Sequence, residues 1–360
     1  MKLTPNTVPA VIASLAAASI MSTTLPGPAG AAEQATSVYL LGSKGSMAGF
    51  IPPPGTYLVD SSYSYSGSAS GSAALGVTAG RTGTRDTANV PLLLEADLNV
   101  DARAYYQMPT VVWVAPQPVL GGHVGFSLTT PIGWKDVGFD LGARATFTLP
   151  SPINRTIQAG RQFSESDDRT AFGDPVASAF IGWHQGPWHW NVGTMVNVPL
   201  GAWDAGRLAN IGFNHWAVDT TGSLTWLDPK VGIEVSLASG FTFNFENPDS
   251  NYKSGTDFHA ELAVMRHFSP QLAIGVVGYH YQQVTGDSGA GAILGDFKGR
   301  VTALGPSLNY TFQLGPVPIN TKLSWYHEFN EENRLKGDAG LLSVTLPLGG
   351  PPPAPAPGLK

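Results

Sequence analysis

Few groups of residues in this sequence could carry out catalytic chemistry, and the best of them is a short serine motif. Gly286-Asp287-Ser288-Gly289 has the form of a serine-protease nucleophile loop, in which a base activates the hydroxyl for attack on a carbonyl. Ala290 stands where a further glycine is expected, and no histidine and aspartate can be assigned as its partners. The G-x-S-x-G elbow is missing as well, because residues 67–71 have alanine at their centre. We interpret residues 286–289 as a turn and expect no catalytic site.

Histidines are the next candidates, because imidazole is a common metal ligand. The eight histidines lack the H-x-x-x-H spacing of a helical metal site. The nearest pairs, His184 with His189 and His259 with His267, lie at or near expected turns. We therefore expect no bound metal and no cofactor.

Two further chemistries compete with simpler interpretations. The acidic run Glu165, Asp167 and Asp168 could bind divalent ions that bridge lipopolysaccharide, but a solvated run of charge is the simpler interpretation. An outer-membrane phospholipase carries serine and histidine on the outside of a barrel, and here His215 or His327 would be the histidine. No serine can be assigned to either, so this enzyme stays the less favoured alternative.

The composition indicates a chain that is not an ordinary soluble domain. Only 13% of the residues are charged, whereas soluble proteins have about 25%, and the chain contains 43 glycines and no cysteine. After residues 1–31, no uninterrupted apolar run reaches the ~18 residues that a membrane helix requires. A formal net charge of −6 argues against a nucleic-acid partner. A membrane form of this protein would therefore have to cross with strands.

Apolar and polar residues alternate with a period of two from about residue 56 onward, as in strands whose two faces meet different environments. In the clearest segment, Val235 and Leu237 alternate with Glu234 and Ser236. Many such segments run for 12 to 16 residues, whereas strands of soluble proteins have about 5 to 6. Aromatic residues beside short turns resemble the girdle at a membrane interface. The pattern favours an all-β, transmembrane, antiparallel up-and-down β-barrel over a soluble sandwich.

Charged residues on the polar face of these strands indicate which face meets water. A charge on the lipid face costs ~2 to 4 kcal/mol at the midplane, so a dozen charges there would be prohibitive. We therefore expect them to line the lumen, where Arg103, Arg144 and Lys322 can pair with acids and narrow the passage. The predicted lumen-lining residues are Glu95, Asp97, Asp101, Arg103, Asp140, Arg144, Asp219, Glu234, Asp257, Glu261, Lys322 and Glu328.

Short turns alternate with longer loops along the chain, which is the topology of outer-membrane barrels. The alternation changes phase near Pro131 to Lys135, and we interpret this as a bulge in one strand. Two shorter strands there would raise the number from twelve to fourteen. The twelve predicted strands are 56–66, 89–115, 121–149, 172–184, 188–199, 212–227, 230–245, 256–268, 271–284, 297–313, 317–330 and 338–348.

The two ends of the chain differ from the strand region. Residues 1–31 have the form of a secretory signal peptide, with an apolar stretch and an A-x-A cleavage site. Residues 32–55 are rich in glycine and proline, so they either fold into the lumen as a plug or hang in the periplasm. The barrel is predicted over residues 56–348, and the proline-rich tail 349–360 cannot form a strand.

Four motifs resemble those of a known family. They are Phe172-Gly173-Asp174-Pro175, Trp226-Leu227-Asp228-Pro229-Lys230, Gly278-Tyr279-His280-Tyr281, and Asn333-Arg334-Leu335-Lys336-Gly337-Asp338. Nearly all of the chain after the leader is similar to the outer-membrane transporter family of meta-pathway phenol-degradation proteins. The resemblance implies an outer-membrane barrel that lets small aromatic compounds cross, and it implies no catalytic or ligand-binding residues.

The combined interpretation is a narrow, passive channel of the bacterial outer membrane. The expected partners are outer-membrane lipid, lipopolysaccharide and the barrel-assembly machinery. The solute, a small aromatic or apolar compound such as a phenol, comes from the family resemblance alone. A structural or adhesive barrel without solute flux stays open as the alternative. The sequence sets no oligomeric state.

Overall fold

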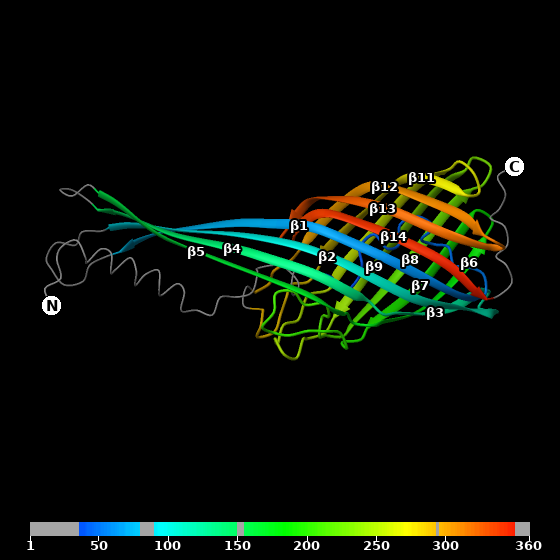
Figure 1. The fold of residues 1–360 in the computed structure, drawn as a ribbon, viewed down its shortest axis with the longest axis horizontal. Coiled ribbons are helices and arrows are strands. Elements are labelled where there is room, and N and C mark those ends of the chain that lie inside the picture. Colours follow the sequence, from blue (N-terminus) through cyan, green and yellow to red (C-terminus); the bar gives the residue numbers. More distant parts are fainter. Residues whose placement is uncertain (1–35, 80–89, 150–154, 293–294, 350–360) are drawn as a thin grey trace. The chain divides into compact units, whose positions relative to one another are not determined.

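The computed structural model describes residues 36–79, 90–149, 155–292 and 295–349, and every regular element in these ranges is a β-strand (Figure 1). The predicted signal peptide and the proline-rich tail lie outside the described residues. No helix among the described residues has the length and apolarity to cross a membrane. The strands are β1 (Gly55–Ala79), β2 (Val90–Val119), β3 (Gly122–Thr129), β4 (Ile132–Leu149), β5 (Arg155–Phe172), β6 (Val176–Gln185), β7 (Trp188–Asn197), β8 (Ala217–Asp228), β9 (Ile233–Asn244), β10 (Asp257–His267), β11 (Leu272–Gln283), β12 (Arg300–Leu314), β13 (Val317–Glu332) and β14 (Lys336–Gly349).

The strands form one sheet that closes on itself. From β6 to β14 each strand pairs with its neighbour in the sequence, β14 pairs with β1, and β6 pairs with β3. A further pairing between β1 and β2 closes the ring, which leaves β4 and β5 as extra strands beside β2. The result is an antiparallel barrel of twelve strands, so the predicted fold class and strand number are confirmed.

The phase change near Pro131 divides the chain between β3 and β4. Thr130 and Pro131 belong to neither strand, because a proline has no N–H for the ladder. The Thr130 amide donates to the Pro109 carbonyl at 3.1 Å, and the Gly173 amide donates to the Pro131 carbonyl at 2.9 Å. The predicted bulge is thus a break between two strands. The described residues contain fourteen strand segments, of which twelve form the ring.

The chain forms two compact units. The barrel unit contains residues 36–67, 102–137 and 167–349 of the described chain. The four-strand unit contains the remaining described parts of β1, β2, β4 and β5. Two of the gaps left between predicted strands are filled by strand in the structure. β1 continues to Ala79, beyond the predicted end at 66, and β5 covers most of the gap between the predicted strands 121–149 and 172–184. Most residues of β5 are exposed, so hydrogen bonding between strands forms this segment without an apolar face to signal it.

Turns and loops alternate in the barrel unit as the sequence predicts. Residues 186–187 and 315–316 form two-residue turns, in which Gly186 (φ 58°) and Gly315 (φ 62°) supply the left-handed backbone that such hairpins need. Longer connections follow at 198–216, 245–256 and 284–299. Trp188 and Phe268, beside short turns, are exposed, in agreement with an interfacial girdle.

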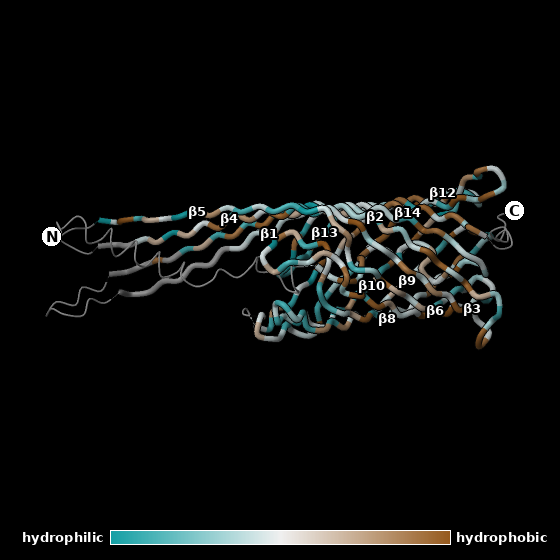
Figure 2. Tube along the Cα trace, turned by 60° about the horizontal axis from the view of Figure 1, so that its bottom comes forward, coloured by the Kyte–Doolittle hydropathy of each residue, from teal (hydrophilic) through white to brown (hydrophobic). Residues whose placement is uncertain are grey.

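The barrel unit has the reverse of a soluble protein's polarity. Along β9, Val235, Leu237 and Phe241 are exposed, whereas Glu234 and Ser236 are completely buried. Figure 2 shows hydrophobic and hydrophilic residues alternating along the barrel strands. The outward face of β9 is thus apolar and its inward face polar, as a barrel in lipid requires.

Candidate functional site

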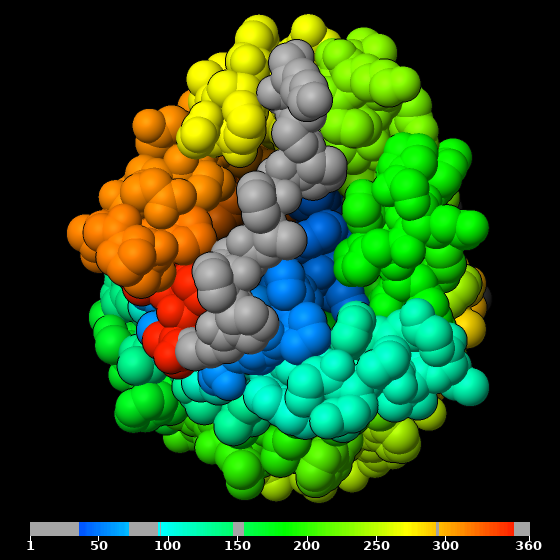
Figure 3. Space-filling model, turned by 90° about the vertical axis from the view of Figure 1, so that its right-hand side faces the viewer, coloured from blue at the N-terminus to red at the C-terminus, as the bar shows by residue number. Residues whose placement is uncertain are grey.

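Residues 36–54, which precede β1, lie within the ring of strands. Figure 3 shows atoms of the N-terminal described residues in the middle of the ring. Asn191 of β7 donates to the Ala48 carbonyl at 2.8 Å, and the Gly49 amide donates to Thr225 of β8 at 2.9 Å. On the other side, Tyr326 of β13 donates to the Gly42 carbonyl at 3.0 Å. The segment therefore bridges strands that are distant from one another around the ring.

Glu261 of β10 binds one turn of this segment with both carboxylate oxygens. One oxygen accepts the Tyr39 hydroxyl at 2.7 Å and the Gly42 amide at 3.1 Å. The other accepts the Lys44 amide at 2.9 Å and the Gly45 amide at 3.0 Å. Gly42 has a left-handed backbone (φ 85°), which lets successive amides converge on one anion. A buried charge with four donors is well compensated.

The Glu261 carboxylate also affects the pKa values of two side chains in this turn, Tyr39 and Lys44. Burial raises the pKa of the Tyr39 hydroxyl well above its usual value, and the charge of Glu261 raises it further. Burial lowers the pKa of the Lys44 ammonium, while Glu261 opposes that shift. Tyr39 therefore stays a neutral hydrogen-bond donor at physiological pH.

Glu234 of β9 forms the second anchor of the segment. Its carboxylate accepts the Met47 amide at 2.6 Å and the Ser46 hydroxyl at 3.0 Å. From the barrel wall it also accepts Ser236 at 2.7 Å and His267 at 2.8 Å. Glu234 is completely buried, so its charge depends on these donors.

Tyrosine hydroxyls are the partners of two further carboxylates. Glu328 of β13 accepts the hydroxyls of Tyr65 and Tyr279, each at 2.8 Å. Asp257 of β10 accepts the hydroxyl of Tyr281 at 2.7 Å. In each of these hydrogen bonds a tyrosine hydroxyl donates to a buried carboxylate.

One side of the interior is apolar and aromatic. A buried cluster extends over the inward faces of β10 to β14 and includes two residues of the N-terminal segment. Tyr63 and Tyr65 of β1 pack against it. Its members are Tyr39, Leu41, Ala263, Met265, Ala273, Val277, Tyr279, Tyr281, Val301, Ala303, Tyr326 and Ala339.

The structure brings together only part of the predicted lumen set. Five carboxylates of the predicted set are buried in the barrel unit: Asp219, Glu234, Asp257, Glu261 and Glu328. Lys322 is partly buried and donates to the Ser43 carbonyl at 3.4 Å. Arg103 is exposed on the face of β2 that also exposes Tyr105 and Trp113, while its neighbour Ala102 is buried. Its placement does not support a role in the lumen.

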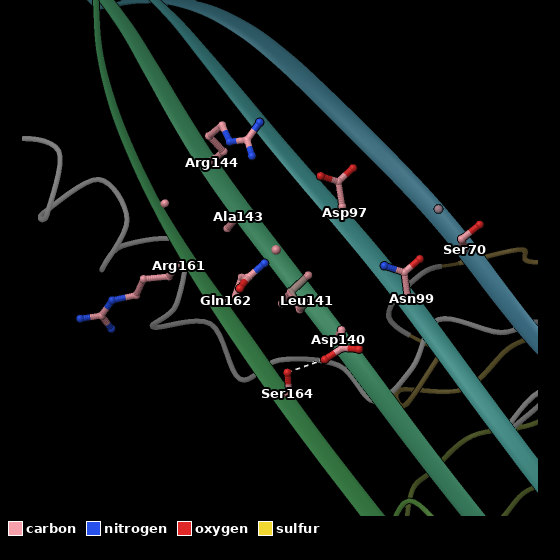
Figure 4. A pocket seen from close by; sticks show the side chains of 13 residues that line it. Ser70, Asp97, Asn99, Asp140, Leu141, Ala143, Arg144, Arg161, Gln162 and Ser164 are labelled. Atoms are coloured by element: carbon pink, nitrogen blue, oxygen red, sulfur yellow. Dashed lines mark hydrogen bonds between the residues drawn. The ribbon is translucent and has the colours of Figure 1, made fainter.

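The remaining five predicted residues belong to the four-strand unit. Asp97, Asp140 and Arg144 line a polar hollow of about 1040 Å³, in which Ser164 donates to Asp140 (Figure 4). Asp101 is exposed and Glu95 is partly buried. These residues are therefore not part of the buried network around the N-terminal segment.

Sequence reasoning missed the tyrosines. Tyr63, Tyr65 and Tyr326 were not singled out, because tyrosine suits either face of a barrel strand. Tyr279 and Tyr281 were noted only as part of a family motif. Their spacing offers a signal in retrospect: Tyr279 and Tyr281 are two residues apart and so share a face of β11, as Tyr63 and Tyr65 do on β1.

The residues considered for catalysis have other partners. Asp287 of the serine motif accepts hydrogen bonds from Tyr252 and Gln283, which fix the loop. His327 contacts Asp338 at 2.9 Å, and His215 contacts the Trp216 carbonyl at 3.0 Å. Within the described ranges neither histidine has a serine partner, and no group of three or more His, Cys, Asp or Glu residues could hold a metal ion.

Solved structures of outer-membrane barrels resemble this chain. The COG4313 outer membrane channel from Pseudomonas putida F1 has 13% sequence identity and a TM-score of 0.53, and the match covers 86% of this chain and 99% of that one. OccD3 (OpdP) of Pseudomonas aeruginosa has 11% identity, a TM-score of 0.31, and coverage of 91% and 95%. The CymD monoaromatic hydrocarbon channel has 10% identity, a TM-score of 0.32, and coverage of 89% and 98%. At 13% identity the likeness to the first concerns the fold alone.

Sequence comparison places the chain more specifically. A search of curated proteins found no match. The family model described as "Putative MetA-pathway of phenol degradation" matches residues 79–344, which is most of the chain. This agrees with the four motifs quoted above, and the chain therefore belongs to that family.

Proposed function

We propose that this protein is a passive channel of the bacterial outer membrane for small aromatic and apolar solutes, and that it is not an enzyme. The observation that carries the proposal is the reversed polarity of the barrel: Leu237 and Phe241 are exposed on the outside, and Glu234 and Glu261 are buried inside. Such a surface needs lipid around it, and its polar interior suits a passage. Export by the signal peptide, insertion by the barrel-assembly machinery and contact with lipopolysaccharide belong to the same proposal.

The side chains that line the interior are suited to bind an aromatic solute. Phenol rings already lie there against aliphatic side chains such as Val277, with their hydroxyls on Glu328 and Asp257. An aromatic solute with a hydroxyl group would find the same kinds of partner. The family description refers to phenol degradation, and the solved structure with the same fold is called an outer membrane channel.

We further propose that residues 36–54 act as a plug and that the buried acids with Lys322 line the passage. Support comes from the two anchors at Glu234 and Glu261 and from the contacts of the segment on opposite sides of the ring. Hydrogen bonds to charged groups are stronger than neutral ones, so the plug is held firmly but reversibly.

Conductance in planar bilayers tests the channel directly. We expect small current steps for the intact protein and larger steps for a variant that lacks residues 36–54, because removal of the segment widens the passage. Phenol added to the widened channel is expected to interrupt the current briefly, whereas cyclohexane-1,4-diol, which has no aromatic ring, is not. Unchanged mobility of the unboiled variant on detergent gels shows that its barrel is intact.

A barrel that carries no current in either form would overturn the channel and favour the structural or adhesive alternative. Release of fatty acid from added phospholipid would instead support the phospholipase. We expect no such release, since His215 and His327 have no serine partner among the described residues.

A further inference from the structure

Tyr39 places a phenol ring in a site that the barrel wall builds. The ring of Tyr39 stacks on the imidazole of His259, with 3.5 Å between centroids and 14° between planes. Its hydroxyl donates to Glu261 at 2.7 Å. His259 and Glu261 are two residues apart on β10, so both project from the same face of the strand. One strand thus supplies a flat stacking surface and a charged acceptor for a single aromatic ring.

The stacking surface is held in place without help from Tyr39. His259 donates from Nε2 to Asp219 of β8 at 2.8 Å. Asp219 in turn accepts the hydroxyls of Thr221 at 2.6 Å and Thr242 at 2.8 Å. Because β8, β9 and β10 all contribute, the imidazole keeps its orientation when the segment that carries Tyr39 moves.

A second observation points to a ligand at this position. His259 is completely buried, and its Nδ1 has no hydrogen-bond partner among the described residues. Nε2 contacts Asp219, so Nδ1 is the ring nitrogen that Tyr39 leaves without a partner. Buried polar atoms of this kind are rare in proteins.

We propose that His259 and Glu261 form a binding subsite for a neutral aromatic solute with a hydroxyl donor, and that Tyr39 occupies this subsite until such a solute displaces it. The inference rests on the proposed function, because the subsite lies in the proposed passage. The side chain of tyrosine is p-cresol attached to a backbone, so a free phenol makes the same stacking contact and the same hydrogen bond.

Displacement of Tyr39 loosens the plug. Glu261 holds Tyr39 together with the amides of Gly42, Lys44 and Gly45. A solute hydroxyl on Glu261 replaces one of these four donors and separates the Tyr39 ring from the wall. Binding of the solute therefore favours release of the plug, and so opens the passage through which the solute moves.

Removal of Tyr39 exposes the subsite to a free ligand of the same shape. We would titrate p-cresol into the full-length protein in detergent and follow binding by calorimetry. Tyr39→Ala is expected to bind p-cresol at least about tenfold more tightly than the intact protein, because the tethered ring no longer competes at its high effective concentration. The matched control is Tyr105→Ala, which removes an exposed tyrosine and is expected to behave like the intact protein.

A second ligand isolates the hydrogen bond. p-Xylene has the ring of p-cresol with a methyl group in place of the hydroxyl, and we expect Tyr39→Ala to bind it at least about tenfold more weakly than p-cresol, as loss of a hydrogen bond to a charged group predicts. Adding Glu261→Gln to Tyr39→Ala is expected to reduce this preference. Equal binding of the two ligands by Tyr39→Ala overturns the subsite. Equal affinity of the intact protein, Tyr39→Ala and Tyr105→Ala for p-cresol overturns it as well.

If Tyr39→Ala does not fold, Tyr39→Phe tests the proposal in its place. The phenylalanine keeps the stacking ring and loses the donor, so it is a weaker competitor, and p-cresol must bind this variant more tightly than it binds the intact protein. An unchanged affinity overturns the proposal. Binding at equilibrium needs no flux, so a closed barrel in the conductance test would reject the channel without affecting this result. Conversely, a conducting barrel without p-cresol binding would reject the subsite alone.

Discussion

The Glu234 carboxylate of β9 accepts the Met47 amide at 2.6 Å, across 187 positions of the sequence. We expect Glu234→Gln to weaken this anchor, because a neutral amide is a poorer acceptor than a carboxylate. The loss of a hydrogen bond to a charged group shifts an equilibrium roughly tenfold or more, so the larger current steps seen without the plug are expected to become more frequent. Single-channel recording measures their frequency.

The control for this variant is Glu246→Gln, which makes the same chemical change at an exposed position just beyond β9. It is expected to leave the recordings unchanged. If Glu234→Gln and Glu246→Gln give the same recordings as the intact protein, Glu234 does not hold the plug.

Gly49 lies so close to the barrel wall that no side chain fits there. A Cβ at this position would lie 2.2 Å from the His189 carbonyl oxygen and 2.5 Å from the Thr225 amide nitrogen. Because both neighbours are backbone atoms, Gly49→Val is expected to displace this part of the plug and raise the conductance toward that of the deletion variant. Gly222→Val is the control, since a Cβ there meets nothing within 4 Å. A normal conductance for Gly49→Val would show that the segment is not packed against β7 and β8.

Glu328 is expected to contribute to stability through its tyrosine partners. Glu328→Leu leaves the hydroxyls of Tyr279, which is buried, and Tyr65, which is partly buried, without their acceptor. Loss of the acceptor of a buried donor costs roughly 1–3 kcal/mol. The temperature at which the barrel loses its fast mobility on detergent gels should therefore fall. Glu332→Leu, at an exposed position paired with Arg300, is expected to change it little. Equal melting of the two variants would contradict the role of Glu328.

Leu237 tests whether the exposed apolar face meets lipid. Leu237→Arg places a charge in the middle of β9, and such a charge on the lipid face costs ~2 to 4 kcal/mol at the bilayer midplane. Val231→Arg introduces the same charge in the turn before β9, where the cost is expected to be ~0 to 1 kcal/mol. Urea unfolding in phospholipid vesicles measures both. A Leu237→Arg variant as stable as Val231→Arg would mean that this face does not contact lipid.

Local pattern was enough to identify the barrel and most of its strands. In β9 and β10 apolar residues recur at most second positions. This period of two specifies an extended segment with one face in each environment, without reference to any other part of the chain. Turn residues such as Gly186 and Gly315 are an equally local signal, because the left-handed backbone of the turn favours glycine. β5 was missed for the complementary reason: its exposed residues carry no alternation.

Tertiary structure alone decided which inward residues meet. Tyr65 and Glu328 are 263 positions apart, and Gly45 and Glu261 are separated by 216, so their contacts depend on strand register around the whole ring and on the path of residues 36–54. Alternation along a strand separates its residues into two faces, but only the pairing with neighbouring strands decides which face points inward. For that reason Arg103 was assigned to the lumen, whereas the pairing of β2 buries its neighbour Ala102 instead. A local sequence pattern specifies the shape of a strand, and only the closed ring specifies which partners its side chains find.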